Sequence, residues 1–220
     1  GGRSYAGMVS GGSLFPGEDV VVLPGGARSR VLSVATFDGE LTEALPSISV
    51  TVTLEDDLDV SRGDLIAPVG SAPTPLGKLE ATLCWFAERP LEEGQQVLVK
   101  HTTRVTPARV YEVRSRLDVG TLTLSPAQRL GDNEIGTVRL AVATPLVADE
   151  YRFNRVTGSF VVIDHASNAI LAAGMVGSPL LATEVEAVAV VDAVVDARRW
   201  TRRWKPRLER GWMPGLERAP

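Results

Sequence analysis

The sequence has few of the side chains on which most catalytic and metal sites depend. Its 220 residues contain one cysteine, Cys84, and two histidines, His101 and His165. One cysteine excludes an internal disulfide and a cysteine-built metal cage, so a secreted disulfide scaffold is excluded and a reducing cytoplasm is expected. The histidines do not have a metal-ligand spacing such as H-x-x-x-H. We interpret each as a surface or hydrogen-bonded residue, and we predict no catalytic and no metal-binding residue.

Glycine-rich phosphate-binding loops are also lacking. No stretch has the pattern G-x-x-x-x-G-K-[ST], and no G-x-G-x-x-G follows an expected strand. Such loops hold phosphate with backbone amides at the start of a helix. We therefore predict no cofactor-binding residue in this chain, and no nucleotide binding by that route.

Long apolar runs and an excess of positive charge are missing too. The longest apolar run, residues 187–195, is interrupted by Asp192 and is shorter than the roughly 20 apolar residues that span a bilayer. Residues 1–5 lack the apolar core of a signal peptide. The net charge of −4 gives no overall attraction to nucleic acid or to an anionic membrane. We expect no membrane partner.

What the sequence does contain is an alternation of apolar and polar residues with a period of two. In residues 47–55, Ile48, Val50, Val52 and Leu54 share one side, which is typical of a half-buried strand. Residues 79–85 alternate in the same way, which places Trp85 in a core, and so do residues 136–142. Shorter runs rich in β-branched residues lie at 20–23, 31–36, 97–99, 109–113 and 160–163.

Turn-forming pairs such as Gly11-Gly12 and Asp38-Gly39 separate these runs. Short strands without amphipathic helices between them indicate an all-β fold built from antiparallel barrels or sandwiches. Residues 68–77 are rich in proline and glycine, as in segments that join domains. We therefore predict a first β-barrel at residues 1–70, a second at 78–177 and a C-terminal tail at 178–220.

The tail differs from the rest of the chain. It is rich in alanine and valine as far as Ala197, then basic, and it carries Trp200, Trp204 and Trp212. Arginine beside tryptophan fits binding to nucleic acid or an anionic surface. Two other interpretations are that the tail is a disordered extension, or that it is an aberrant C-terminus from a coding sequence read out of frame. We expect it to be irregular or partly helical.

An acidic run, residues 55–59, is the remaining candidate for a cation site. Calcium loops combine alternating oxygen ligands with a glycine turn and a late glutamate, and the glycine and glutamate are missing here. We interpret the run as a solvated loop that closes a strand.

Several phrases, taken in order, resemble one family. Residues 5–13 (YAGMVSGGS) and 16–24 (PGEDVVVLP) resemble the second domain of translation-type GTPases such as elongation factor Tu. Other phrases narrow the resemblance to the large, GTP-binding subunit of bacterial sulfate adenylyltransferase; they lie at residues 28–31, 36–39, 54–64, 81–90, 100–104, 133–136 and 151–176. The resemblance extends over residues 4–176.

The resemblance implies two consecutive antiparallel β-barrels of the elongation-factor-Tu domain 2 and domain 3 type. The GTPase domain that precedes them in the family, with its GTP and Mg²⁺, is expected upstream, and so is the first strand of the first barrel. Family members pair with a small catalytic subunit that makes adenylyl sulfate and pyrophosphate from ATP and sulfate. Some also carry an adenylyl-sulfate kinase domain. No GTP-binding residue of the family can be transferred to this chain.

The implied function is that of a scaffold and subunit-docking fragment in sulfate assimilation, inactive alone. Its partners would be the small catalytic subunit and the missing GTPase domain. Two alternatives stay open: a translation-factor-like pair of barrels that binds tRNA or the ribosome, and a free-standing interaction module whose basic tail recruits an anionic partner. The acidic composition weighs against nucleic acid.

Overall fold

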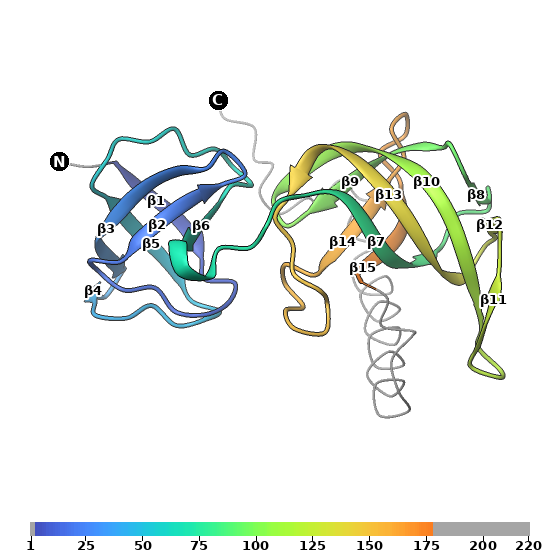
Figure 1. Ribbon diagram of the computed structural model, residues 1–220, viewed down its shortest axis with the longest axis horizontal. Coiled ribbons are helices and arrows are strands. Elements are labelled where there is room, and N and C mark those ends of the chain that lie inside the picture. The colour runs from blue at the N-terminus through green and yellow to red at the C-terminus, as the bar shows by residue number, and fades with distance from the viewer. Residues whose placement is uncertain (1–2, 178–220) are drawn as a thin grey trace. The chain divides into compact units, whose positions relative to one another are not determined.

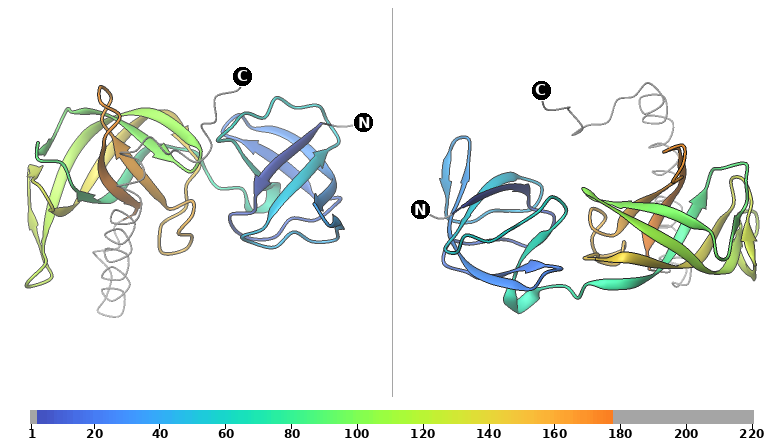
Figure 2. Two further views of the ribbon diagram at one scale, coloured as in Figure 1. Left: turned by 180° about the vertical axis from the view of Figure 1, so that it is seen from behind. Right: turned by 90° about the horizontal axis from the view of Figure 1, so that it is seen from above.

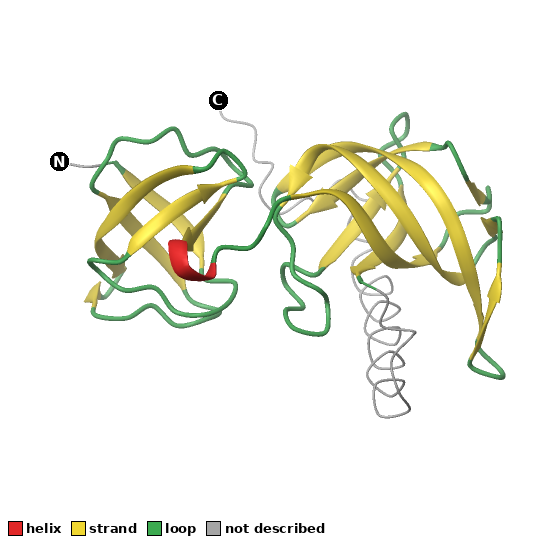
Figure 3. Cartoon of the chain, in the orientation of Figure 1, coloured by secondary structure: helices red, strands yellow, loops and turns green. Residues whose placement is uncertain are grey.

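The computed structural model describes residues 3–177, and their regular structure is almost entirely β-strand (Figures 1 and 3). The one helical element in this range is a short 3-10 turn, η1 (Val69–Ser71). The expected all-β fold is confirmed. None of the described helices is long and apolar enough to cross a bilayer. The predicted tail, residues 178–220, lies outside the described residues.

The first barrel is a six-stranded antiparallel sheet in the order β1-β5-β3-β2-β6, with β4 paired to β3. Strand β3 is long enough to pair with β2 through its first half and with β5 and β4 through its second half. This change of partner curls the sheet around its core. The strands are β1 (Ser4–Met8), β2 (Asp19–Leu23), β3 (Ala27–Thr36), β4 (Gly39–Leu41), β5 (Ser49–Leu54) and β6 (Leu65–Pro68).

The core of the first barrel follows from the predicted alternation. Val50, Val52 and Leu54 of β5 are buried, while Ser49 before them and Thr51 between the valines are exposed. Strand β2 is different because four of its five residues are buried, and therefore both of its faces are covered. Val147 of the second barrel helps to cover its outer face, as described below.

The second barrel is a closed ring of six antiparallel strands (Figures 1 and 2). The ring runs β10-β13-β7-β15-β14-β9 and returns to β10, which pairs with β9 through its first part and with β13 through the rest. Strand β11 extends β10 beyond the ring, and β8 pairs with β12. The strands are β7 (Leu76–Trp85), β8 (Leu91–Glu92), β9 (Gln96–His101), β10 (Arg104–Asp118), β11 (Thr123–Pro126), β12 (Arg129–Leu130), β13 (Ile135–Leu146), β14 (Ser159–Ile163) and β15 (Ile170–Val176).

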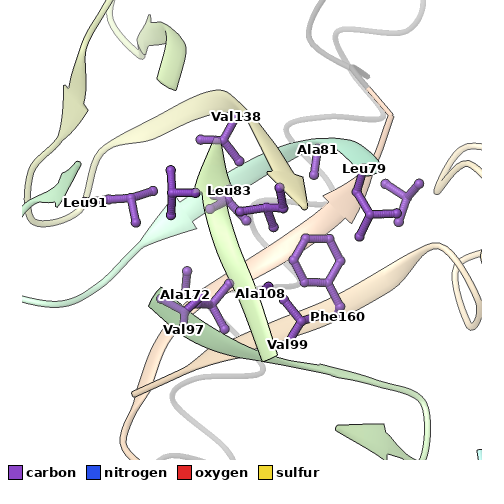
Figure 4. Close-up of a cluster of buried hydrophobic side chains, with 14 of the residues drawn as sticks. Leu79, Ala81, Leu83, Leu91, Val97, Val99, Ala108, Val138, Phe160 and Ala172 are labelled. Carbon is purple, nitrogen blue, oxygen red and sulfur yellow. The ribbon is translucent and has the colours of Figure 1, made fainter. Parts of the chain in front are cut away.

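Side chains from every strand of the ring meet in the second core (Figure 4). Leu79, Ala81 and Leu83 point inward from β7, and Phe160 does so from β14. Trp85 is fully buried, as its place in the alternation predicts, and its indole Nε1 donates to the carbonyl of Arg89 at 2.9 Å. Burial of a large aromatic side chain with its one polar atom satisfied is strongly stabilising.

The strands expected at 20–23, 31–36, 47–55, 79–85, 97–99, 109–113, 136–142 and 160–163 all form, with shifted ends. The limits predicted for the domains stay predictions. The strands of the first sheet end at Pro68, those of the second begin at Leu76, and Gly1–Gly177 form one compact unit.

Candidate functional site: the junction between the barrels

Three loops and the start of one strand carry the polar contacts that join the two barrels. The first barrel contributes the β1–β2 loop, residues 9–18, and the β5–β6 loop, residues 55–64. The second contributes the start of β10, directly after the β9–β10 turn, and the β13–β14 loop, residues 147–158. We call these contacts, with the apolar contact described below, the junction.

An ion pair forms the first contact. Arg104, the first residue of β10, bonds through Nη2 to the Oδ1 atom of Asp64, and its Nε donates to the carbonyl of Gly63 at 3.2 Å. The other carboxylate oxygen of Asp64 accepts the amide of Ser61 at 2.8 Å, which fixes the acid in place. The two charged side chains are only 19% and 14% exposed. Their attraction is therefore less screened by water than that of a surface pair.

Gly63 lets the two chains approach closely at this contact. Its φ of +93° lies in the region that favours glycine. A Cβ built there would lie 2.7 Å from the Cβ of Arg104. Any side chain at position 63 would therefore push the two barrels apart.

Asn154 forms the second contact from the β13–β14 loop. Its amide Nδ2 donates to the carbonyl of Ser10 in the first barrel and to the Oδ2 atom of Asp149, each at 3.1 Å. Its Oδ1 accepts the amides of Val156 at 3.0 Å and Thr157 at 3.3 Å. One side chain therefore shapes its own loop and reaches the other barrel.

His101 lies between these two contacts and connects them. It is 4% exposed, and its Nε2 donates to the carbonyl of Thr157 at 2.6 Å. Burial lowers the pKa of His101, and this effect outweighs the Thr157 hydrogen bond and the negative charge of Asp149, which both favour the protonated ring. The nearby charge of Arg104 lowers the pKa further. The ring is accordingly neutral at physiological pH and acts as a hydrogen-bond donor.

An apolar contact completes the junction. Val147, at the start of the β13–β14 loop, is buried against Val21 and Leu23 on the outer face of β2. Leu65 and Ala72 pack against the same cluster. This explains why β2 is buried on both faces, since its inner face lines the first core.

The structure shows where each candidate site residue named from the sequence lies. His101 is the hydrogen-bonded histidine of the junction, and His165 is exposed in a turn after Asp164. Cys84 is buried on β7. In the acidic run, Asp56 accepts the hydroxyl of Ser29 at 2.8 Å and Asp57 pairs with Arg3 at 2.8 Å. Within residues 3–177, no group of three His, Cys, Asp or Glu side chains is arranged to hold a metal ion.

The side chains that make the junction were not predicted from the sequence. Arg104, Asp64 and Asn154 are separated by up to 90 residues, and periodicity says nothing about loops that meet in space. One signal was available, because the phrases that carry the family resemblance at residues 5–13, 54–64, 100–104 and 151–176 contain these residues and their partners. The role of the junction is structural, because its hydrogen bonds, ion pair and apolar contact hold the two barrels together.

The chain is similar to known proteins in its sequence. Residues 78–177 match the family described as GTP-eEF1A C-terminal domain-like. Over 201 residues the chain is 40% identical to "Sulfate adenylyltransferase subunit 1" of Laribacter hongkongensis, which covers 90% of this chain and 40% of that protein. The resemblance to the sulfate adenylyltransferase large subunit is confirmed.

A second curated relative and a solved structure are also similar to this chain. The chain is 45% identical over 176 residues to the "Bifunctional enzyme CysN/CysC" of Mycobacterium tuberculosis, a match that covers 79% of this chain and 29% of that one. Among solved structures, Sup35 complexed with GDP aligns with a TM-score of 0.72 at 18% identity, over 80% of this chain and 43% of that one. That likeness confirms the translation-factor type of barrel fold. The chain spans 29% and 40% of the length of these two curated relatives.

Proposed function

We propose that the two barrels are the scaffold and subunit-docking part of a GTP-dependent large subunit of sulfate adenylyltransferase, acting in sulfate assimilation. The observation that carries the proposal is the 40% identity to a protein of that name across 90% of this chain. The partners would be a small catalytic subunit and a GTPase domain, which would hold GTP and Mg²⁺. A cytoplasmic location goes with this role.

The physical role of such barrels is to transmit a movement without deforming. When a GTPase loses the γ-phosphate, its switch segments lose contacts and the domain shifts against its neighbours. A lever for that shift has to be stiff along its length. The closed second barrel, the partly buried Arg104–Asp64 pair and the Asn154 bridge to Ser10 support this role, because they tie two cores into one body.

The proposal assigns no chemical step to this chain. The purified 220-residue chain should show neither GTP hydrolysis nor adenylyl sulfate formation above background, since it offers no phosphate-binding loop. Turnover in a preparation free of contaminating enzyme would contradict this. Tight, salt-dependent binding of tRNA would instead favour the translation-factor alternative.

A competition assay tests the proposal itself. Excess chain is added to the catalytic subunit of the same organism before the full-length large subunit is supplied, and adenylyl sulfate formation is followed. We expect the activity to fall with increasing chain, because the barrels occupy the docking surface without supplying a GTPase. A heat-unfolded sample of the chain is the control. Unchanged activity at a large molar excess would contradict a docking role.

A further inference from the structure

The β13–β14 loop, residues 147–158, presents an apolar and cationic tip to solvent. Phe153 is 75% exposed, and Val156 of the same loop is 41% exposed. The guanidinium of Arg152 lies 4.5 Å from the centre of the Phe153 ring, and that of Arg155 lies 6.0 Å from the Tyr151 ring. Figures 1 and 2 show the loop projecting from the strands that it connects.

The base of this loop is held by many hydrogen bonds. Asp149 accepts from the side chains of Asn154 and Thr157, the latter at 2.6 Å. The amide of Tyr151 donates to the carbonyl of Val176 at 3.0 Å, and the amide of Val176 returns a bond to Gly158 at 2.8 Å, so both ends of the loop are fastened to β15.

Gly158 shows how tightly the loop is closed. A Cβ at this position would lie 2.4 Å from the Cα of Tyr151 and 2.5 Å from the carbonyl oxygen of Asn154. Only glycine fits this approach. The aromatic tip therefore belongs to a closed, hydrogen-bonded loop and not to a flexible segment.

A rigid loop with an exposed aromatic ring is suited to binding. Phenylalanine and arginine are enriched in protein interfaces, where a few anchors in apolar pockets supply most of the affinity. An anchor that is already held in place loses little conformational freedom on binding. A flexible loop would instead lose conformational entropy each time it bound a partner.

The charges around the tip favour a protein over a nucleic acid. Glu150 pairs with Arg152 at 2.7 Å, and Asp149 lies at the base of the same loop. These carboxylates and the net charge of −4 oppose a phosphate backbone. They oppose a single carboxylate at the edge of an apolar pocket much less than a run of phosphates, because one arginine can pair with that carboxylate while the pocket receives Phe153.

We infer that the β13–β14 loop is the element through which the barrels dock the catalytic subunit. Phe153 enters an apolar pocket of that partner, and Arg152 or Arg155 pairs with a carboxylate at the edge of the pocket. This inference rests on the proposed function for its choice of partner. It adds the residues that make the contact.

The test is a titration of the full 220-residue chain against the purified catalytic subunit of the same organism, by isothermal calorimetry. Phe153→Ala should weaken binding about 10-fold or more, as expected for an interface anchor. Because Phe153 is largely exposed, the variant should fold with the melting temperature of the parent chain. Phe37→Ala, which removes a fully exposed ring in the first barrel, is the matched control and should bind like the parent.

Each outcome decides the inference. Binding by the parent chain, with a large loss in Phe153→Ala alone, supports it. If the parent binds and Phe153→Ala binds equally well, the loop assignment is wrong while the docking function stands. If the parent does not bind, both are wrong. If Phe153→Ala still binds the catalytic subunit but no longer binds tRNA in a parallel titration, the loop is a nucleic-acid contact and the inference is overturned.

Discussion

Arg104 and Arg30 show how much the surroundings of an ion pair matter at the scale of single residues. Arg30 pairs with Asp19 at 2.8 Å, but both side chains are more than half exposed. Arg104 pairs with Asp64 where both are mostly covered, and it also donates to Gly63. Water competes with the first pair and screens it, whereas removing one partner of the second leaves a charge without compensation.

Replacing Arg104 with methionine should therefore destabilise the protein. The substitution keeps most of the apolar stem, removes two hydrogen bonds and leaves Asp64 unpaired, so we expect a loss of about 2 kcal/mol in the free energy of unfolding. Urea denaturation at pH 7 measures it. Arg30→Met is the control and should leave the urea midpoint nearly unchanged. Equal effects of the two substitutions would show that the junction pair is no stronger than a surface pair.

His101 gives the junction a pH dependence whose sign follows from its burial. Its folded-state pKa lies below the unfolded value because burial disfavours the charged ring. The unfolded chain therefore binds the proton more readily, and stability falls as the pH drops below about 6.5, the ordinary histidine pKa. The carboxylates with lowered pKa values, Asp118, Glu134 and Asp164, lose their stabilising effect only at more acidic pH.

The urea midpoint should consequently be lower at pH 5.5 than at pH 7.5. His101→Gln keeps an amide donor near the position of Nε2 and removes the titrating ring, so its midpoint should change much less over the same range. A parent chain whose midpoint is constant between these pH values would contradict the account of His101. An equal pH dependence in His101→Gln would assign the effect to another group.

At the scale of structural elements, the β13–β14 loop has two tasks that share Asn154. This residue shapes the loop through Val156 and Thr157, and it reaches the first barrel through Ser10. Gly11 lies beside the same amide, which a Cβ at that position would approach within 2.9 Å. Loss of the Asn154 side chain should therefore loosen the loop and the junction together.

Hydrogen exchange measures this loosening. In Asn154→Ala the amides of Val156 and Thr157 lose their acceptor, and we expect their exchange to quicken roughly tenfold, the effect of one hydrogen bond. Ser167→Ala is the control, because Ser167 bonds within the β14–β15 turn, and it should leave those two amides unchanged. Unchanged protection in Asn154→Ala would show that the loop is held by its backbone bonds alone.

The elements differ in how far the sequence predicts them. Leu79, Ala81, Leu83 and Trp85 are all buried, as their alternation predicts. Thr82 and Cys84 between them are buried as well, so both faces of β7 are covered there and its polar face was not predicted correctly. β2 shows no alternation, since Val147 covers its second face. The partners Arg104, Asp64 and Asn154 could not be paired from sequence, because loop contacts leave no periodic trace. The family resemblance, not periodicity, supplied the proposed function.

At the scale of the whole molecule, the two barrels have separate cores and a shared boundary. The first core contains Val20 and Leu54, and the second contains Trp85 and Phe160. Between them the junction combines an ion pair, an amide bridge and an apolar contact. Cores linked in this way unfold together only if the boundary contributes enough free energy.

Calorimetry should show this coupling directly. We expect one unfolding transition in the parent chain and two in the double variant Arg104→Met, Asn154→Ala, because each barrel keeps its own core. The double loss should also differ from the sum of the single losses, as it does for sites that share a structure. Two transitions in the parent chain would contradict a stiff pair of barrels.

The central claim is that these barrels dock a catalytic subunit, and sedimentation velocity tests it most directly. The chain is sedimented alone, and then with increasing amounts of the catalytic subunit of its own organism. We expect a faster boundary that contains both proteins and saturates at a fixed ratio. Two independent boundaries at every ratio, with both proteins folded, would contradict the claim.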